Sequence, residues 1–467
     1  MFKKYETMNA TTLTIFLLLL SSVAYYLGRK RAYNVAQGKL RNLHSLPSYY
    51  GIYVAIWCGL PALLLASGWL AFEDTIITNM VVAELPQEIL DKGDDRLNLI
   101  ANDINNLVAG NITSGEVTPT MQQAADHYLS LRSTSHAAMS VLVLVLAIGG
   151  ASFTLTKIRA DQRARNVVEN MLMVILIACS SIAILTTIGI VLSVLFESIR
   201  FFQKIPVFDF LFGLQWSPQT AIRADQAGSS GAFGAIPLLV GTGLVAFIAM
   251  FVAAPIGLLS AIYLSEYAHS KVRATAKPLL EILAGIPTVV YGFFAALVVA
   301  PWLRDLGTSM GLDVASESAL AAGLVMGIMI IPFVSSLSDD VINAVPQSLR
   351  DGAYAIGATQ SETVRKVIIP AALPGIVGGM LLAVSRAIGE TMIVVMAAGL
   401  SANLTVNPLE AVTTVTVQIV TLLTGDQEFD SSKTLAAFAL GLLLFTMTLI
   451  LNVIALHVVR KYREQYE

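Results

Sequence analysis

Two charged side chains lie inside one of the most apolar stretches of the chain. Arg386 and Glu390 stand within residues 383–391, and hydrophobic residues extend on both sides of them. A charge at the centre of a membrane helix costs about 2.5–3.5 kcal/mol on insertion scales, so charges kept there usually serve a function. Their i, i+4 spacing predicts that both side chains lie on one face of one helix, near the middle of a span.

An arginine at this depth suits an anion. Its guanidinium offers fixed donors that match the oxygens of phosphate. The carboxylate of Glu390 would keep Arg386 from holding that anion permanently. We therefore predict that the two residues lie on an anion path. The alternative is a structural ion pair between packed helices, and outside partners are expected in either case.

A second apolar stretch, residues 281–292, contains residues that break helices. They are Gly285, Pro287 and Gly292. Broken helices at membrane depth are tolerated where they line a cavity or pack inside protein, and they often mark transport paths. Thr288 could offer its hydroxyl to such a path, although a simple packing kink is the alternative. Pro255 and Pro332 are expected to kink two neighbouring spans.

The sequence carries no motif for catalysis or nucleotide binding. It contains no G-x-x-x-x-G-K-[ST], H-E-x-x-H or C-x-x-C, which excludes a Walker ATP site and the common zinc sites. We expect Cys58 and Cys179 to be small buried side chains rather than a disulfide or a metal pair. The chain is therefore not expected to be an enzyme or to hold a cofactor or metal. If transport is driven by ATP, then ATP and Mg must bind to other subunits.

Composition places the chain in the membrane. It has 467 residues, of which 55% are hydrophobic and 13% charged, whereas soluble domains carry about 25% charged residues. The net charge of −3 gives no sign of a nucleic-acid partner. We predict an all-α, polytopic transmembrane bundle surrounded by lipid. Nine stretches reach the roughly 20 residues that a span needs: 10–27, 50–72, 136–156, 167–196, 235–263, 279–300, 319–337, 374–400 and 434–457.

Basic residues predict the orientation. Nine spans with the N-terminus outside place 18 Lys and Arg residues in the five inner segments and 10 in the outer ones. Because basic residues gather in cytoplasmic loops, the N-terminus is predicted to be periplasmic and the C-terminus cytoplasmic.

The chain is expected to have four parts. Residues 1–72 form a two-span region, and 73–135 form an acidic extracytoplasmic insert with apolar positions at helical spacing. Residues 136–166 hold the third span and a basic cytoplasmic loop. Residues 167–467 hold a core of six spans.

One cytoplasmic loop of that core, residues 346–370, has the pattern of a helical hairpin. Two short helices are expected around Gly357, and Thr359 or Ser361 is the candidate N-cap of the second. Pro370 is expected to close the unit before the next span.

The first helix of this hairpin is amphipathic. Leu349, Ala353 and Ile356 share one apolar face. Such a hairpin either packs on the protein's own helix ends or fits a groove on a soluble partner.

This loop resembles the EAA loop of bacterial ABC importer permeases, whose pattern is E-A-A-x3-G-x9-I-x-L-P. The positions that fall at those spacings are Asp351, Gly352, Ala353, Gly357, Val367, Ile369 and Pro370. In that family the loop docks into the ATPase subunit and passes its closure to the membrane helices. The resemblance thus implies a coupling role for Asp351, Ala353, Ile356, Gly357 and Pro370.

Further segments make residues 167–467 similar to phosphate ABC transporter permeases of the PstC type. These segments are residues 231–237, 283–292, 344–346 and 386–392. The resemblance implies a type I importer core in the bacterial inner membrane. It also implies a second permease of the PstA type, two ATPase subunits and a periplasmic phosphate-binding protein as partners, with Arg386 and Glu390 important for phosphate passage.

Two other functions stay open at this point. One is an ABC permease for another oxyanion such as sulfate or molybdate, because a guanidinium matches all of them. The other is a secondary transporter that uses the Arg386–Glu390 pair, which would need no docking hairpin.

Overall fold

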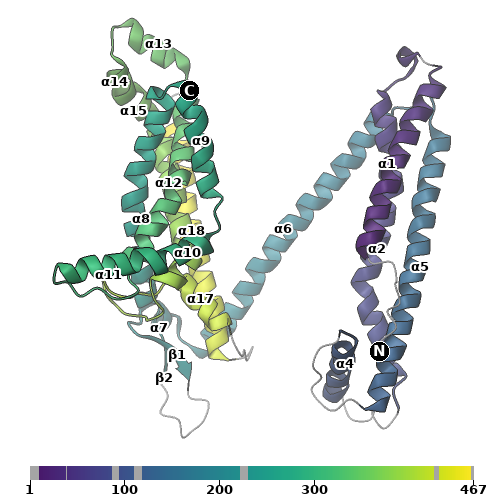
Figure 1. The fold of residues 1–467 in the computed structure, drawn as a ribbon, viewed down its shortest axis with the longest axis horizontal. Coiled ribbons are helices and arrows are strands. Elements are labelled where there is room, and N and C mark those ends of the chain that lie inside the picture. Colours follow the sequence, from purple (N-terminus) through teal and green to yellow (C-terminus); the bar gives the residue numbers. More distant parts are fainter. Residues whose placement is uncertain are drawn as a thin grey trace. The chain divides into compact units, whose positions relative to one another are not determined.

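Apolar residues at helical spacing form long helices in most of the chain (Figure 1). The computed structural model describes residues 10–37, 39–86, 94–109, 118–220, 230–424 and 431–463. The parts of the predicted acidic insert at 87–93 and 110–117 lie outside these residues. The chain divides into two compact units, Met1–Ile184 and Leu185–Glu467, and each is described by itself.

The first unit is built on three long helices. They are α1 (Ala10–Val35), α2 (Pro47–Ala83) and α5 (Pro119–Lys157), with a short 3₁₀ helix η1 (Leu40–Asn42) between the first two. Tyr50, Cys58 and Met139 are fully buried in its core. Gly28 lets α1 and α2 approach closely, because a Cβ there would lie 2.9 Å from the carbonyl oxygen of Tyr50.

Most of the described residues of the predicted insert belong to the long helices α2 and α5. Helix α2 runs on to Ala83 and α5 already begins at Pro119. Between them, α4 (Asp94–Ala109) confirms the helix that the apolar spacing predicted. Its Ile104 packs against Ile77 and Tyr128 of the two long helices.

The second unit holds the predicted core. Helix α6 (Ala164–Lys204) begins in the first unit and ends in the second. The other long helices are α8 (Ile236–Ile262), α12 (Ala319–Ala344), α15 (Ile369–Ile388) and α18 (Ser432–Arg463). Shorter helices are α7 (Val207–Phe212), α9 (Ser270–Ala284), α10 (Thr288–Phe294), α11 (Ala300–Ser309), α13 (Gln347–Ala355), α14 (Gln360–Thr363), α16 (Met392–Ala397) and α17 (Val415–Leu423). Three π-helices join some of them: η2 (Tyr263–Tyr267), η3 (Ala295–Val299) and η4 (Val364–Ile368).

Helices α8 and α12 form the centre of this unit. Ala249 and Ala253 of α8 and Met326 of α12 are buried at their contact. Pro255 and Pro332 lie inside α8 and α12, and both helices continue past them.

A small antiparallel hairpin is the exception to the helical pattern. Strands β1 (Trp216–Thr220) and β2 (Ser230–Phe233) pair with Trp216 opposite Phe233. The buried Trp216 Nε1 donates to Gln418 Oε1 at 2.9 Å, which joins the two strands to α17.

The described residues include nine helices that are long and apolar enough to cross a membrane, which confirms the polytopic all-α prediction. The sixth begins at Thr288 rather than at 279, because α9 ends before Gly285. Cys58 is buried as expected, but Cys179 is exposed on α6 and that prediction is wrong.

The arrangement of the second unit agrees with the prediction that its loops alternate between the two sides of the membrane. The hairpin of α13 and α14 lies at the same end of the bundle as the end of α18, and strands β1 and β2 lie at the opposite end (Figure 1). Which end faces the cytoplasm stays a prediction.

Candidate functional site

The helix that carries Arg386 ends two residues after it. Helix α15 stops at Ile388, Gly389 is its C-cap, and α16 begins at Met392. Glu390 therefore lies in the break between two helices. The prediction that Arg386 and Glu390 share one face near the middle of a continuous span is wrong.

Arg386 and Glu390 have different partners. The Arg386 side chain is exposed in this single chain, and its guanidinium lies 5.3 Å from the centre of the Phe333 ring. Glu390 Oε1 accepts from the backbone N–H of Met392 at 3.1 Å, at the N-terminus of α16, where the helix dipole favours a negative charge. In the described part of the chain no ion pair joins Arg386 to Glu390.

Residues from other helices contact the segment between α15 and α16, and α16 itself. Thr416 Oγ1 donates to the backbone oxygen of Glu390 at 2.8 Å and so pairs a carbonyl that lies between the two helices. On the other side, Gly292 contacts α16, because a Cβ there would lie 2.7 Å from Met396 Sδ and 3.1 Å from the Met392 oxygen. Gly292 thus permits close packing and does not interrupt α10.

The break at Gly285 and Pro287 is confirmed. Gly285 is the C-cap of α9 and Pro287 the N-cap of α10. Tyr291 Oη donates to the Leu283 backbone oxygen at 2.9 Å and so ties the two helices together across the break. Thr288 is half-buried in the first turn of α10 and forms no hydrogen bond with Arg386 or Glu390 among the described residues.

A cavity of about 210 Å³ adjoins the aromatic partner of Arg386. Phe333 and Pro332 of α12 line it, together with residues of α9 and η2. Its polar lining residues are Lys277, Glu281, Ser335, Ser336 and Asp339. Phe333 therefore both contacts the exposed guanidinium and lines this cavity.

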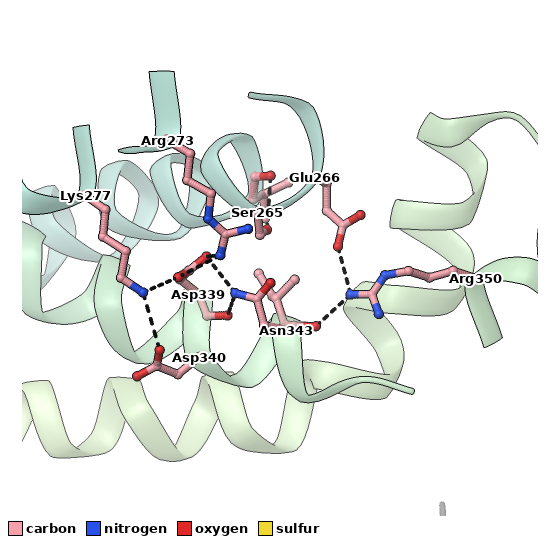
Figure 2. Close-up of polar contacts among 10 residues, drawn as sticks. Ser265, Glu266, Arg273, Lys277, Asp339, Asp340, Asn343 and Arg350 are labelled. Atoms are coloured by element: carbon pink, nitrogen blue, oxygen red, sulfur yellow. Dashed lines mark hydrogen bonds and ion pairs between the residues drawn. The ribbon is translucent and has the colours of Figure 1, made fainter. Parts of the chain in front are cut away.

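One buried carboxylate organises the charges beside this cavity (Figure 2). Asp339 of α12 is only 3% exposed. It accepts hydrogen bonds from Arg273 Nη2 at 3.1 Å, Lys277 Nζ at 2.8 Å and Asn343 Nδ2 at 2.9 Å. The bond to Asp339 raises the pKa of Lys277. The cluster ties α9 to α12, as a buried charge needs to be paired.

The predicted cytoplasmic hairpin is confirmed as two helices around Gly357. Gly357 has φ +87°, a left-handed conformation that glycine adopts without strain. Thr359 is the N-cap of α14, and a complete capping box joins it to Glu362. The prediction that Pro370 closes the unit is wrong, because α14, η4 and α15 follow one another without a break and Pro370 lies in the first turn of α15.

The hairpin presents apolar side chains to its surroundings. Ile356 is 87% exposed, and Leu349 and Tyr354 are also exposed. Ala353 is buried, whereas Leu349 and Ile356 are exposed. The three side chains therefore do not form the single apolar face that was predicted. The exposed Asp351 accepts from Gln347 Nε2 at 3.1 Å within α13.

Sequence reasoning missed the polar contacts that attach this hairpin to the bundle. Arg350 of α13 pairs with Glu266 of η2 at 3.0 Å (Figure 2). These residues are 84 positions apart, and no local pattern joins them. The Asp339 cluster was also missed, because the predicted span ended at 337 and left Asp339 in a loop.

Comparisons with known proteins match both parts of the chain. Residues 253–464 match the family model described as "Binding-protein-dependent transport system inner membrane component", and residues 14–186 match the model described as "Phosphate ATP-binding cassette transporter". The first match contains Arg386, the hairpin and the Asp339 cluster.

Curated relatives are similar over half of the chain or more. The "Probable ABC transporter permease protein YqgH" of Bacillus subtilis (strain 168) is 32% identical over 276 residues, which cover 59% of this chain and 85% of the relative. The phosphate transport system permease protein PstC of Mesorhizobium japonicum is 34% identical over 263 residues, which cover 53% and 77%.

A solved structure is also similar. It is the MetNI methionine ABC transporter in an inward-facing conformation, with a TM-score of 0.36 and 19% identity over 49% of this chain and 94% of that one. The extent and identity of the matches to the curated relatives show the family. The chain therefore belongs to the inner membrane components of binding-protein-dependent transport systems, as a phosphate ABC transporter permease of the PstC type.

Proposed function

We propose that this chain is the membrane-spanning subunit of an ATP-driven importer of inorganic phosphate. The observation that carries the proposal is the family match over residues 253–464, since that region contains both a guanidinium beside a broken span and an exposed apolar hairpin. Curated relatives of similar sequence are named as phosphate permeases.

The hairpin is the proposed docking element for an ATPase subunit. Its exposed Ile356, together with Leu349 and Tyr354, forms an apolar surface that can bind in a groove of a soluble protein. Asp351, Ala353 and Gly357 belong to the hairpin and are proposed to serve coupling there. Pro370, in the first turn of α15, is proposed to serve coupling where the second arm continues into the span. ATP and Mg bind to two ATPase subunits in this proposal, and hydrolysis takes place there.

Arg386 is the proposed anion ligand of the path. An arginine in a spanning segment that is exposed in the single chain needs water, an ion or another protein chain beside it. A second permease of the PstA type is the proposed neighbour, and a periplasmic phosphate-binding protein delivers the anion. Glu390 and Thr288 are proposed as further path residues near the two helix breaks.

Transport into proteoliposomes tests this function. The complete complex, reconstituted with its ATPase and binding-protein partners, should take up labelled phosphate only when ATP is present, and should take up sulfate far more slowly. Preferred uptake of sulfate would favour the other oxyanion permeases. Uptake by this chain alone under an ion gradient would favour a secondary transporter and contradict the proposal.

A further inference from the structure

The side chain of Arg350 points from the hairpin back into the bundle (Figure 2). Its Nη1 donates to the Val345 backbone oxygen at 2.6 Å, and its Nη2 donates to the Ile342 backbone oxygen at 2.9 Å and to Glu266 Oε1 at 3.0 Å. The Arg350 side chain is only 11% exposed and that of Glu266 only 9%. One guanidinium therefore joins three separate acceptors in a nearly closed space.

The three acceptors belong to the ends of two spans. Ile342 lies in the last turn of α12 and Val345 is its C-cap, where helix carbonyls lack partners and carry partial negative charge. Glu266 lies in η2, which continues α8 without a break. Arg350 thus connects α13 to the two helices at the centre of the core.

The second arm of the hairpin contacts the same residue. Gln360 Nε2 donates to the backbone oxygen of Glu266 at 2.6 Å, from the first turn of α14. Both arms are therefore fixed to the end of α8 at one residue, while the tip around Ile356 is left exposed. Movement of the tip can reach α15 directly through η4, whereas it reaches the ends of α8 and α12 through these contacts.

The geometry points to Arg350 and Glu266 as the joint through which movement of the hairpin is passed to α8 and α12. This inference rests on the proposed function, in which an ATPase subunit moves the hairpin. Arg350 is a positioning residue, since it touches no substrate. A lysine, which carries one point charge, cannot reproduce the planar fork that reaches three acceptors. A nearly buried carboxylate left without its cation is costly, so the two residues act together.

Glu266→Gln and Arg350→Lys in the complete reconstituted complex test this joint. Glu266→Gln keeps the size and one acceptor oxygen but removes the charge. We expect copurification of the ATPase subunits and basal ATP hydrolysis to stay at wild-type levels. The stimulation of ATP hydrolysis by the binding protein with inorganic phosphate should fall about tenfold, as expected for a lost charged hydrogen bond. Arg350→Lys should act in the same direction.

Asp340→Asn is the matched control. Asp340 lies at the same rim of the bundle, its side chain is 66% exposed, and it is 3.7 Å from Lys277. Among the residues drawn in Figure 2, its dashed line runs to Lys277 and none runs to Arg350 of the hairpin. Removal of this acid should leave both assembly and stimulation unchanged, because an exposed ion pair contributes little.

The outcomes separate the inference from the function on which it rests. Full stimulation in both Glu266→Gln and Arg350→Lys would overturn the joint, and so would a loss of assembly or basal hydrolysis that accounts for the lost stimulation. A wild-type complex that phosphate does not stimulate would contradict the proposed function instead.

Discussion

Replacement of Gly357 by alanine tests whether the bent shape of the hairpin is needed for docking. Gly357 adopts φ +87°, and a residue with a Cβ pays about 1–2 kcal/mol in the left-handed region. A Cβ at this position would meet no heavy atom within 4 Å. The whole cost of the substitution is therefore backbone strain, with no clash to relieve.

This strain should appear as lost affinity for the ATPase subunit. If the free variant relieves the strain by unbending and docking must restore the bend, then about 1–2 kcal/mol corresponds to a Kd roughly 5–30 times higher. Gly352→Ala provides the matched control. Gly352 lies inside α13 and an added Cβ there is also free of contacts, but its backbone is helical. Alanine should stabilise α13 by about 1 kcal/mol and leave docking intact or slightly stronger.

The assay is a titration of purified ATPase subunits against the permease complex in nanodiscs, with the same preparation for each variant. Circular dichroism and elution volume check that the variants are folded. Unchanged affinity in Gly357→Ala would refute the reasoning, because the strained hairpin would then dock as well as the native one. An equal loss in Gly352→Ala would refute it too, since that would show sensitivity to any added methyl group.

Three other substitutions test separate parts of the structure. Arg386→Ala should abolish ATP-dependent phosphate uptake while the ATPase subunits still copurify, and normal uptake would remove Arg386 from the path. Gly292→Leu should lower the yield of folded protein and its melting temperature in detergent, because its Cβ would lie 2.7 Å from Met396 Sδ; wild-type stability would contradict the close contact of α10 and α16. Thr359→Ala should destabilise the hairpin by about 1 kcal/mol through loss of the capping box. The α14 amides should then exchange hydrogen faster, and unchanged exchange would contradict a stabilising role of the cap.

Local patterns in the sequence were enough to predict most of the helices. Hydrophobic runs give the nine candidate spans because a membrane helix needs only length and apolar side chains. The hairpin could be predicted because its signals, Gly357 and the Thr359–Glu362 box, are also local. The break at Gly285 and Pro287 followed from the same kind of signal.

Features that depend on distant partners could not be predicted in this way. The contacts of Thr416 and Gly292 beside the break come from distant parts of the chain, and neither is visible in the run around Glu390. The pair of Arg350 and Glu266 likewise arises only when the hairpin folds back on α8. The conformations of Arg386 and Glu390 therefore had to come from the structure.

The unbroken run from α14 through η4 to α15 has a mechanical consequence. At 1.5 Å per residue, the distance from Gln360 to Arg386 along this run is about 40 Å. In the proposed function, the arm that docks on the ATPase subunit and the guanidinium of Arg386 are thus opposite ends of one continuous helical run. A tilt of about 10° would displace one end by roughly 7 Å relative to the other. In the proposed function, ATP hydrolysis on the partner subunits would therefore move the charge of Arg386 without any refolding near it.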